Sequence, residues 1–151
     1  MQRVGNKRWI KPAIILIIAI LSTPYALLES AGLGSSNLHI RAPFWEYVQS
    51  FYFSGFQLLD LTSVISGLPF LILRLFSLVV VIAYFQGRIS KNITLLLSSI
   101  IELGPLVVTA MGILEMVNSP AYIVMWPLPI LLGIILILIQ TISVNEPTSP
   151  F

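Results

Sequence analysis

The chain has 151 residues, 57% of them hydrophobic and 9% charged, with a formal net charge of +2. Soluble domains carry about 25% charged residues, and these residues normally cover the surface. The composition therefore argues against a water-soluble globule, a disordered chain and a nucleic-acid-binding domain. The excess of basic over acidic residues is too small to bind a polyanion. We expect an integral membrane protein.

Reactive side chains are scarce. The chain has no cysteine and one histidine, His39, so disulfides are impossible and metal sites built from Cys and His are not expected. The G-x-S-x-G nucleophile elbow and the glycine-rich nucleotide-binding motifs are missing. These observations predict a protein that is not an enzyme and that needs no cofactor or metal.

Apolar segments long enough to cross a bilayer define the expected architecture. A transmembrane helix needs about 20 mostly apolar residues, and four stretches qualify: 12–28, 64–85, 93–114 and 121–142. The sequence thus predicts an all-α integral membrane protein with a four-helix antiparallel transmembrane domain over residues 12–142. A basic cytoplasmic N-terminus (1–11) precedes this domain, and a disordered, Pro-containing cytoplasmic tail (143–151) follows it.

Basic residues indicate an orientation. Six of them lie on one side of the predicted spans and one, Arg41, on the other; the six are Arg3, Lys7, Arg8, Lys11, Arg88 and Lys91. The positive-inside rule then places both termini in the cytoplasm, with the cell membrane as the expected location. The alternative is that the first apolar segment is a cleaved signal peptide, which would leave three spans.

An aromatic segment follows the first span. Residues 44–61 contain seven aromatic side chains, and the first five are the candidate interfacial aromatics: Phe44, Trp45, Tyr47, Phe51 and Tyr52, followed by Phe53 and Phe56. Polar residues fall largely on the opposite face of a helical projection. We expect an amphipathic helix on the outer leaflet, where Trp and Tyr are favoured. The alternative is that this segment extends the second transmembrane helix.

Two charges lie inside the predicted spans. Arg74 is about 18 Å and Glu102 about 15 Å from the cytoplasmic ends of the second and third spans, at about 1.5 Å per residue. Because a short loop joins these helices, we expect the two side chains to form an ion pair. Such a pair either fixes helix register, serves a transport or proton-linked function, or contacts a partner subunit or a lipid headgroup.

Small and polar residues recur at intervals of three and four in the third and fourth spans. They predict a kinked, polar seam where helices approach closely, formed by Pro105, Thr109, Pro127, Pro129 and Gln140. Each proline frees a backbone carbonyl, and freed carbonyls mark either a kink or, less commonly, a cation site.

Taken together, the residues predict a small, non-enzymatic, multi-pass membrane protein that serves as a structural or accessory subunit. The alternative is a small transporter or oligomeric channel that uses the Arg74–Glu102 pair. The expected partners are the lipid bilayer and other membrane subunits or further copies of the chain, and no nucleic acid is expected.

Overall fold

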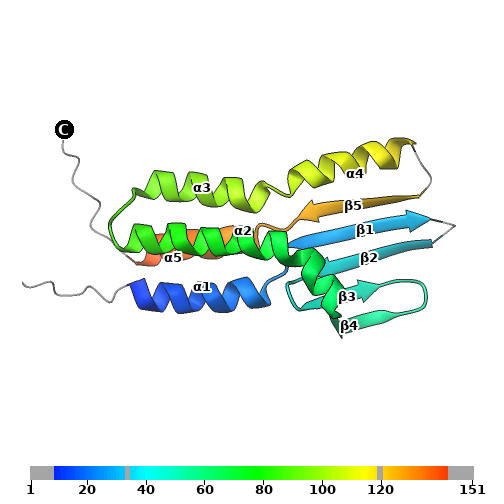
Figure 1. The fold of residues 1–151 in the computed structure, drawn as a ribbon, viewed down its shortest axis with the longest axis horizontal. Helices are drawn as coiled ribbons and strands as arrows, with labels where there is room; N and C mark the ends of the chain where they lie inside the picture. The colour runs from blue at the N-terminus through cyan, green and yellow to red at the C-terminus, as the bar shows by residue number, and fades with distance from the viewer. Residues whose placement is uncertain (1–8, 33–34, 119–120, 143–151) are drawn as a thin grey trace, which may run out of the picture.

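The computed structural model describes residues 9–32, 35–118 and 121–142, which form helices and one sheet. In chain order the elements are α1 (Ile10–Ser22), β1 (Ala26–Gly32), β2 (Ser35–Arg41), β3 (Trp45–Gln49), β4 (Ser54–Leu58), α2 (Leu61–Phe85), α3 (Lys91–Leu103), α4 (Leu106–Asn118), β5 (Tyr122–Pro127) and α5 (Ile130–Thr141). Figure 1 shows α1, α2, α3 and α5 together at one end, which we call the helical end. The strands and α4 form the other end, the sheet end.

The sheet has five antiparallel strands in the order β4-β3-β2-β1-β5. Four of these strands come from the segment between α1 and α2. The fifth, β5, pairs with β1 across a long stretch of sequence, with Ala26 opposite Pro127 and Ala31 opposite Tyr122. The sheet therefore joins the chain before α2 to the chain before α5.

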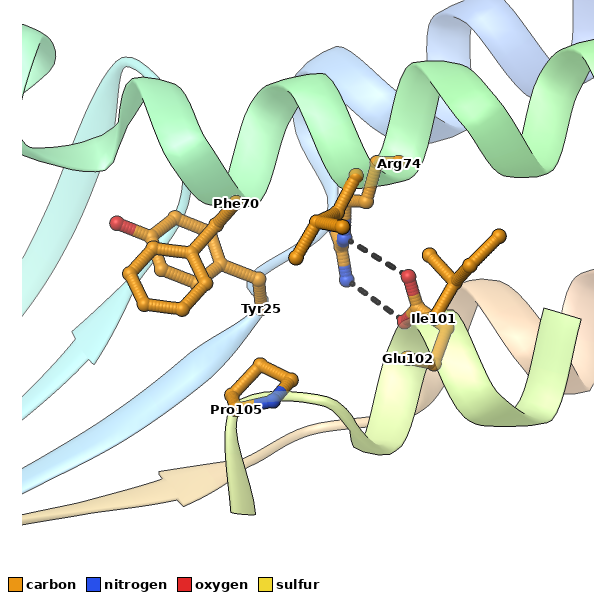
Figure 2. A pocket seen from close by; sticks show the side chains of 7 residues that line it. Tyr25, Phe70, Arg74, Ile101, Glu102 and Pro105 are labelled. Carbon is orange, nitrogen blue, oxygen red and sulfur yellow. Dashed lines mark hydrogen bonds and ion pairs between the residues drawn. The ribbon is translucent and has the colours of Figure 1, made fainter. Parts of the chain in front are cut away.

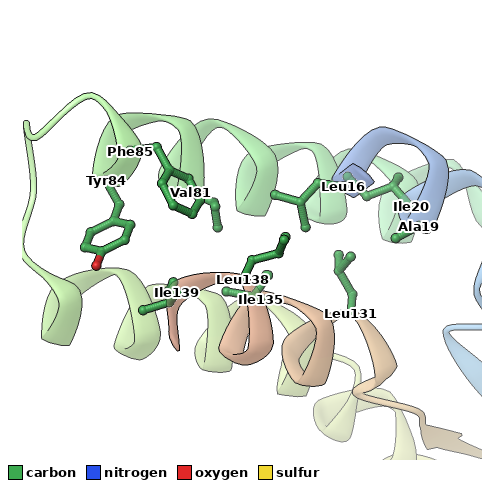
Figure 3. Close-up of a cluster of buried hydrophobic side chains, with 10 residues drawn as sticks. All are labelled: Leu16, Ala19, Ile20, Val81, Tyr84, Phe85, Leu131, Ile135, Leu138 and Ile139. Atoms are coloured by element: carbon green, nitrogen blue, oxygen red, sulfur yellow. The ribbon is translucent and has the colours of Figure 1, made fainter. Parts of the chain in front are cut away.

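The helical end has its own apolar core (Figure 3). Its fully buried members come from α1, α2 and α5: Leu16, Ile20, Val81, Leu131 and Ile135. Gly87, with a φ of 72°, reverses the chain between α2 and α3 in a left-handed conformation that favours glycine. The reversal lays α3 beside α2 (Figure 1).

The predicted first span, residues 12–28, is wrong in its second half. The helix ends at Ser22, and Thr23 is already extended with φ −84° and ψ 140°. Thr23 precedes Pro24, and a residue before proline is pushed out of the helical region. The apolar residues that follow therefore enter β1 instead of continuing the helix.

The predicted interfacial helix over residues 44–61 is also wrong, as is its alternative, an extension of the second helix. The segment forms the hairpin of β3 and β4, with Tyr47 opposite Phe56. Aromatic residues favour strands, and Trp45 and Tyr47 alternate with Glu46 and Val48, which is the period of a strand. The helical spacing of the apolar residues was coincidental.

The predicted third span, residues 93–114, is divided into two helices. The first, α3, ends at Leu103, and α4 begins after Gly104 and Pro105. Proline has no N–H to donate and clashes with the preceding turn, so the helix breaks at this point.

The predicted fourth span, residues 121–142, is a strand followed by a short helix. Its first part, rich in β-branched and aromatic residues, pairs with β1 as β5, and α5 starts after Pro129. Hydrophobicity alone does not distinguish a buried strand from a helical segment. Here the segment forms a strand because it can pair with the free edge of β1.

The all-α, four-span bundle is thus wrong, because the fold is mixed and contains a five-stranded antiparallel sheet. Among the described residues, α2 is the one helix long and apolar enough to cross a membrane. The apolar helices α1 and α5 have 13 and 12 residues. At about 1.5 Å per residue they are shorter than the roughly 30 Å hydrocarbon layer. An integral multi-pass protein of the cell membrane with both termini in the cytoplasm does not fit this structure.

Candidate functional site at the Arg74–Glu102 junction

The two intramembrane charges of the sequence prediction lie in contact where the helical end meets the sheet end (Figure 2). Arg74 belongs to α2 and Glu102 to the last turn of α3. Both side chains are 3% exposed. Opposite charges stabilise one another when buried, provided that their remaining donors and acceptors find partners.

The guanidinium group of Arg74 is fully occupied. Its Nε lies 3.3 Å from Oε1 of Glu102, and one Nη2 bond of 3.3 Å reaches Oε2 of the same carboxylate. The other bonds reach the link between α1 and β1: Nη1 donates to Thr23 O at 2.8 Å and to Thr23 Oγ1 at 3.1 Å, and Nη2 donates to Pro24 O at 3.0 Å. Each of the three guanidinium nitrogens therefore has a partner within the chain.

Through these bonds, Arg74 of α2 connects α3 to the link between α1 and β1. We call Arg74 together with Thr23, Pro24 and Glu102 the Arg74 clasp. The two carbonyls that Arg74 satisfies belong to the link between α1 and β1, which lies outside the hydrogen-bond pattern of the helix. The carboxylate ties α3 to the same point. Because one side chain orients α1, α2 and α3 at the start of the sheet, we interpret the pair as a structural element of this junction.

Aromatic rings cover one side of the clasp. The Tyr25 and Phe70 rings stack with centroids 5.1 Å apart, and the Arg74 guanidinium carbon lies 5.8 Å from the Tyr25 centroid. A small pocket is lined by these residues together with Leu73, Ile101, Glu102 and Pro105 (Figure 2). Burial raises the pKa of Tyr25 above its ordinary value of 10.0, against the opposing effect of Arg41 and Arg74. Tyr25 thus stays neutral at physiological pH.

Small hydroxyl side chains continue from the clasp along the contact between α2 and α3. Ser77 and Ser98 are fully buried, and neither hydroxyl has a partner among the described residues. Thr94 is also fully buried and donates to the carbonyl of Ser90. The small side chains allow the two helices to approach closely, in the manner of small residues at helix contacts.

The residues of the predicted polar seam lie in different places. Pro105 lines the pocket beside the clasp, and the Thr109 hydroxyl donates to the carbonyls of Pro105 and Met125. Pro127 ends β5, and Pro129 is the N-cap residue of α5, so neither lies inside a helix. Gln140 is exposed in the last turn of α5. The seam is therefore not brought together as one site.

The predicted interfacial aromatics gather on the β3–β4 hairpin. Trp45 and Tyr47 both contact the Phe56 ring, with centroids 5.5 and 5.0 Å apart. Phe51 and Tyr52 lie at the turn and are 83% and 92% exposed, and Phe44 is 43% exposed. The Trp45 indole N–H donates to the carbonyl of Ser22 at 3.1 Å and so fixes the hairpin to the end of α1.

The sheet also holds a polar cluster that the sequence prediction missed. Glu46 accepts a 2.7 Å hydrogen bond from Gln57 and lies 3.5 Å from Nδ1 of His39. Arg41 donates to the carbonyl of Ser63 at 3.0 Å and ties the sheet to the start of α2. The alternation of polar and apolar residues from Leu38 to Arg41 was the available signal, because it is the period of a strand with one polar face.

The sequence prediction also missed Thr23, Pro24 and Tyr25 as partners of Arg74. The Thr-Pro pair was a signal for a helix end. Over the described parts of the chain, no cluster of three or more His, Cys, Asp or Glu residues is suited to hold a metal ion. Comparison with known proteins finds no matching family, no similar curated protein and no similar solved structure.

Proposed function

We propose that this chain is a non-enzymatic, lipid-contacting protein with a structural or accessory role. In this proposal the apolar outer surface of the helical end contacts lipid, and the sheet end presents a surface to water. The observation that carries the proposal is the outer surface of the helical end, which is covered by large apolar side chains. Water-soluble monomers seldom expose an apolar surface of this extent.

The exposed apolar residues come from all four helices of that end. Ile18 of α1, Val79 of α2, Leu96 of α3 and Ile137 of α5 are each between 60% and 62% exposed. The same helices contain four charged residues: Lys11, Arg74, Lys91 and Glu102. Arg74 and Glu102 are paired in the interior, and Lys11 and Lys91 lie in the first turns of their helices. The middle of the surface is therefore free of charge, as contact with lipid requires.

The sheet end has a different chemistry. It carries Glu29, His39, Arg41 and Glu46, which form hydrogen bonds or ion pairs across strands or to α2. Such groups are costly to bury in hydrocarbon. The sheet end also exposes large apolar side chains, such as Leu58 of β4 and Val107 of α4. The difference between the two ends is therefore the set of polar groups on the strands, and these groups support placing the strands in water.

The geometry gives no specific support to the alternative role as a small transporter or channel. A transport site in an apolar surrounding needs a polar group that can exchange partners with its substrate. Each guanidinium nitrogen of Arg74 already has a partner within the chain. A transport cycle through this pair would first have to break bonds that hold the junction together.

Vesicle flotation tests the proposal. The purified chain, diluted from detergent into phosphatidylcholine vesicles, should float with the lipid on a density gradient. Val79→Glu and Ile137→Glu should reduce the floated fraction, because each places a charge on the apolar surface that is proposed to contact lipid, and a charge is costly to transfer out of water.

The matched control is Tyr52→Glu, which places the same charge at a 92% exposed position of the sheet end. This variant should float like the wild-type chain. The proposal fails if the wild-type protein stays at the bottom of the gradient, or if Tyr52→Glu reduces flotation as much as the helical variants do.

A further inference from the structure

The two edges of the sheet differ in their surroundings. At one edge, α4 packs along β5, and the Thr109 hydroxyl donates to the outward carbonyl of Met125 (Figure 1). At the other edge, β4 pairs with β3 on one side only. Phe56 and Leu58 of β4 are 73% and 84% exposed. Among the described residues, one edge is covered by a helix, whereas the other edge has no strand paired with its outward backbone groups and exposes apolar side chains.

The hydrogen-bond pattern shows which backbone groups of β4 point outward. Leu59 N donates to Phe44 O at 3.0 Å, and Ser50 N donates to Phe53 O at 2.8 Å. Hydrogen-bonded and non-hydrogen-bonded pairs alternate along an antiparallel ladder. The backbone groups of Gly55 and Gln57 therefore face β3, and those of Ser54, Phe56 and Leu58 face away from the sheet.

The composition of this edge restricts its partner. Residues 50–59 contain no charged residue and no proline, although natural sheets usually protect an open edge with one or the other. An uncharged apolar edge is complementary to another uncharged apolar edge. In Figure 1 the turn between β3 and β4 also points away from the helical end, so lipid around those helices does not cover it.

We propose that β4 pairs edge to edge with β4 of a second copy of this chain, in antiparallel orientation about a two-fold axis at Phe56. Phe56 then lies opposite its own counterpart, and Ser54 lies opposite Leu58 of the other copy. All three positions have outward-facing backbone groups, so each pair exchanges two hydrogen bonds. The two sheets become one continuous sheet, and the Phe56 rings add to the aromatic contacts with Trp45 and Tyr47.

A symmetric parallel dimer would not pair the outward-facing N–H and C=O groups of β4. In a parallel ladder, a residue whose backbone points toward the partner faces a residue whose backbone points away. A two-fold axis along the strand would place two outward-facing Phe56 residues opposite each other. Antiparallel pairing is thus the symmetric solution, and it directs the two helical ends away from each other. If those ends contact lipid, which rests on the proposed function, the dimer joins two lipid surfaces.

The absence of cysteine allows a direct test, because each introduced thiol is unique. The full chain in detergent micelles is compared as the single variants Phe56→Cys and Gln57→Cys under mild oxidation. Hydrogen-bonded pairs have Cα atoms about 5.5 Å apart, within the disulfide range of about 4.4–6.8 Å. Gln57 is staggered from its counterpart by two residues, so its Cα–Cα separation is roughly 8 Å.

Phe56→Cys should form a covalent dimer at least about tenfold faster than Gln57→Cys, since only the former pair reaches disulfide geometry. A mixture of Ser54→Cys and Leu58→Cys should give the mixed dimer and little of either homodimer. No dimer, equal rates at positions 56 and 57, or homodimers from position 54 would overturn the proposal. A chain that is monomeric on its own, as expected if a different protein or lipid covers β4, would also overturn it.

A second measurement uses the outward N–H of Phe56. Phe56→Pro removes this donor without removing a bond to β3, and Phe56→Ala removes the ring but keeps the donor. The mass of the protein in detergent should fall to that of a monomer for the proline variant, with an intermediate effect for alanine. Because this measurement needs no lipid, its failure is distinguishable from a failure of vesicle flotation.

Discussion

Arg74 is the residue on which the arrangement of the two ends depends. The sequence predicted its contact with Glu102 from the depths of the two residues in neighbouring helices, and the structure places them together. The bonds to Thr23 and Pro24 could not be predicted from helical spacing, because they require α1 to stop at Ser22. A charge inside an apolar segment therefore indicated the junction, while the local effect of proline determined its other partners.

Substitutions at the clasp should show that the stability of the fold depends on the bonds from Arg74 to the carbonyls of Thr23 and Pro24 as well as on its charge pairing with Glu102. Arg74→Met leaves the Glu102 carboxylate buried without its cation, which typically costs about 3–5 kcal/mol of unfolding free energy. The exchange of Arg74→Glu with Glu102→Arg should not restore stability, because a carboxylate at position 74 would face the carbonyls of Thr23 and Pro24. Unfolding by denaturant in detergent micelles measures both effects.

Full recovery of the wild-type unfolding free energy by the exchanged pair would contradict this account. It would show that the carbonyl contacts contribute nothing and that charge balance alone is required. Glu102→Gln provides a milder comparison, since the amide retains an acceptor for Arg74.

At the scale of helices and strands, the sequence predicted the elements whose structure is determined by the residue pattern within one segment. The second span was expected at 64–85, and α2 runs from Leu61 to Phe85. The failures occur where distant pairing decides the outcome. Residues 122–127 are apolar enough for a membrane helix, and they form a strand because β1 offers a free edge almost a hundred residues earlier. Periodicity within one segment does not contain that information.

The start of α2 gives a prediction about pH. The Asp60 carboxylate accepts a 2.7 Å hydrogen bond from the backbone N–H of Ser63. Hydrogen bonding to the Ser63 side chain, together with this backbone bond, lowers the pKa of Asp60 below the ordinary 3.8. A lowered pKa in the folded state stabilises the fold above pH 3.8, and this stabilisation is lost as the pH falls through the folded value. Asp60→Ala should therefore lower the melting temperature at pH 7, with the difference from wild type shrinking below pH 3.8.

Asp60→Asn is the control, because its amide oxygen also caps a helix but does not titrate in this range. Its melting temperature should follow that of the wild type at pH 7 without the additional acid sensitivity. A difference between wild type and Asp60→Ala that stays constant from pH 7 to pH 2.5 would contradict the assignment of Asp60 as a charged cap.

At the scale of the whole molecule, apolar residues serve two purposes that composition does not distinguish. Some are buried between helices or strands, as Leu16 and Val124 are, while others such as Val79 and Ile137 cover the outside of the helical end. The 9% of charged residues led to the prediction of an integral membrane protein, which the mixed fold contradicts. Composition did not indicate that the sheet end would hold most of the polar contacts, because that division appears only once the strands are paired.

The central claim is that the helical end contacts lipid while the sheet end contacts water, and spin-label accessibility tests it most directly. Single labels at Val79→Cys, Ile137→Cys and Tyr52→Cys, in a chain without other cysteines, are compared in vesicles. Labels at positions 79 and 137 should collide readily with oxygen, which partitions into lipid, and poorly with a water-soluble nickel complex. The label at position 52 should show the opposite preference. The same preference for the nickel complex at all three positions would contradict the account.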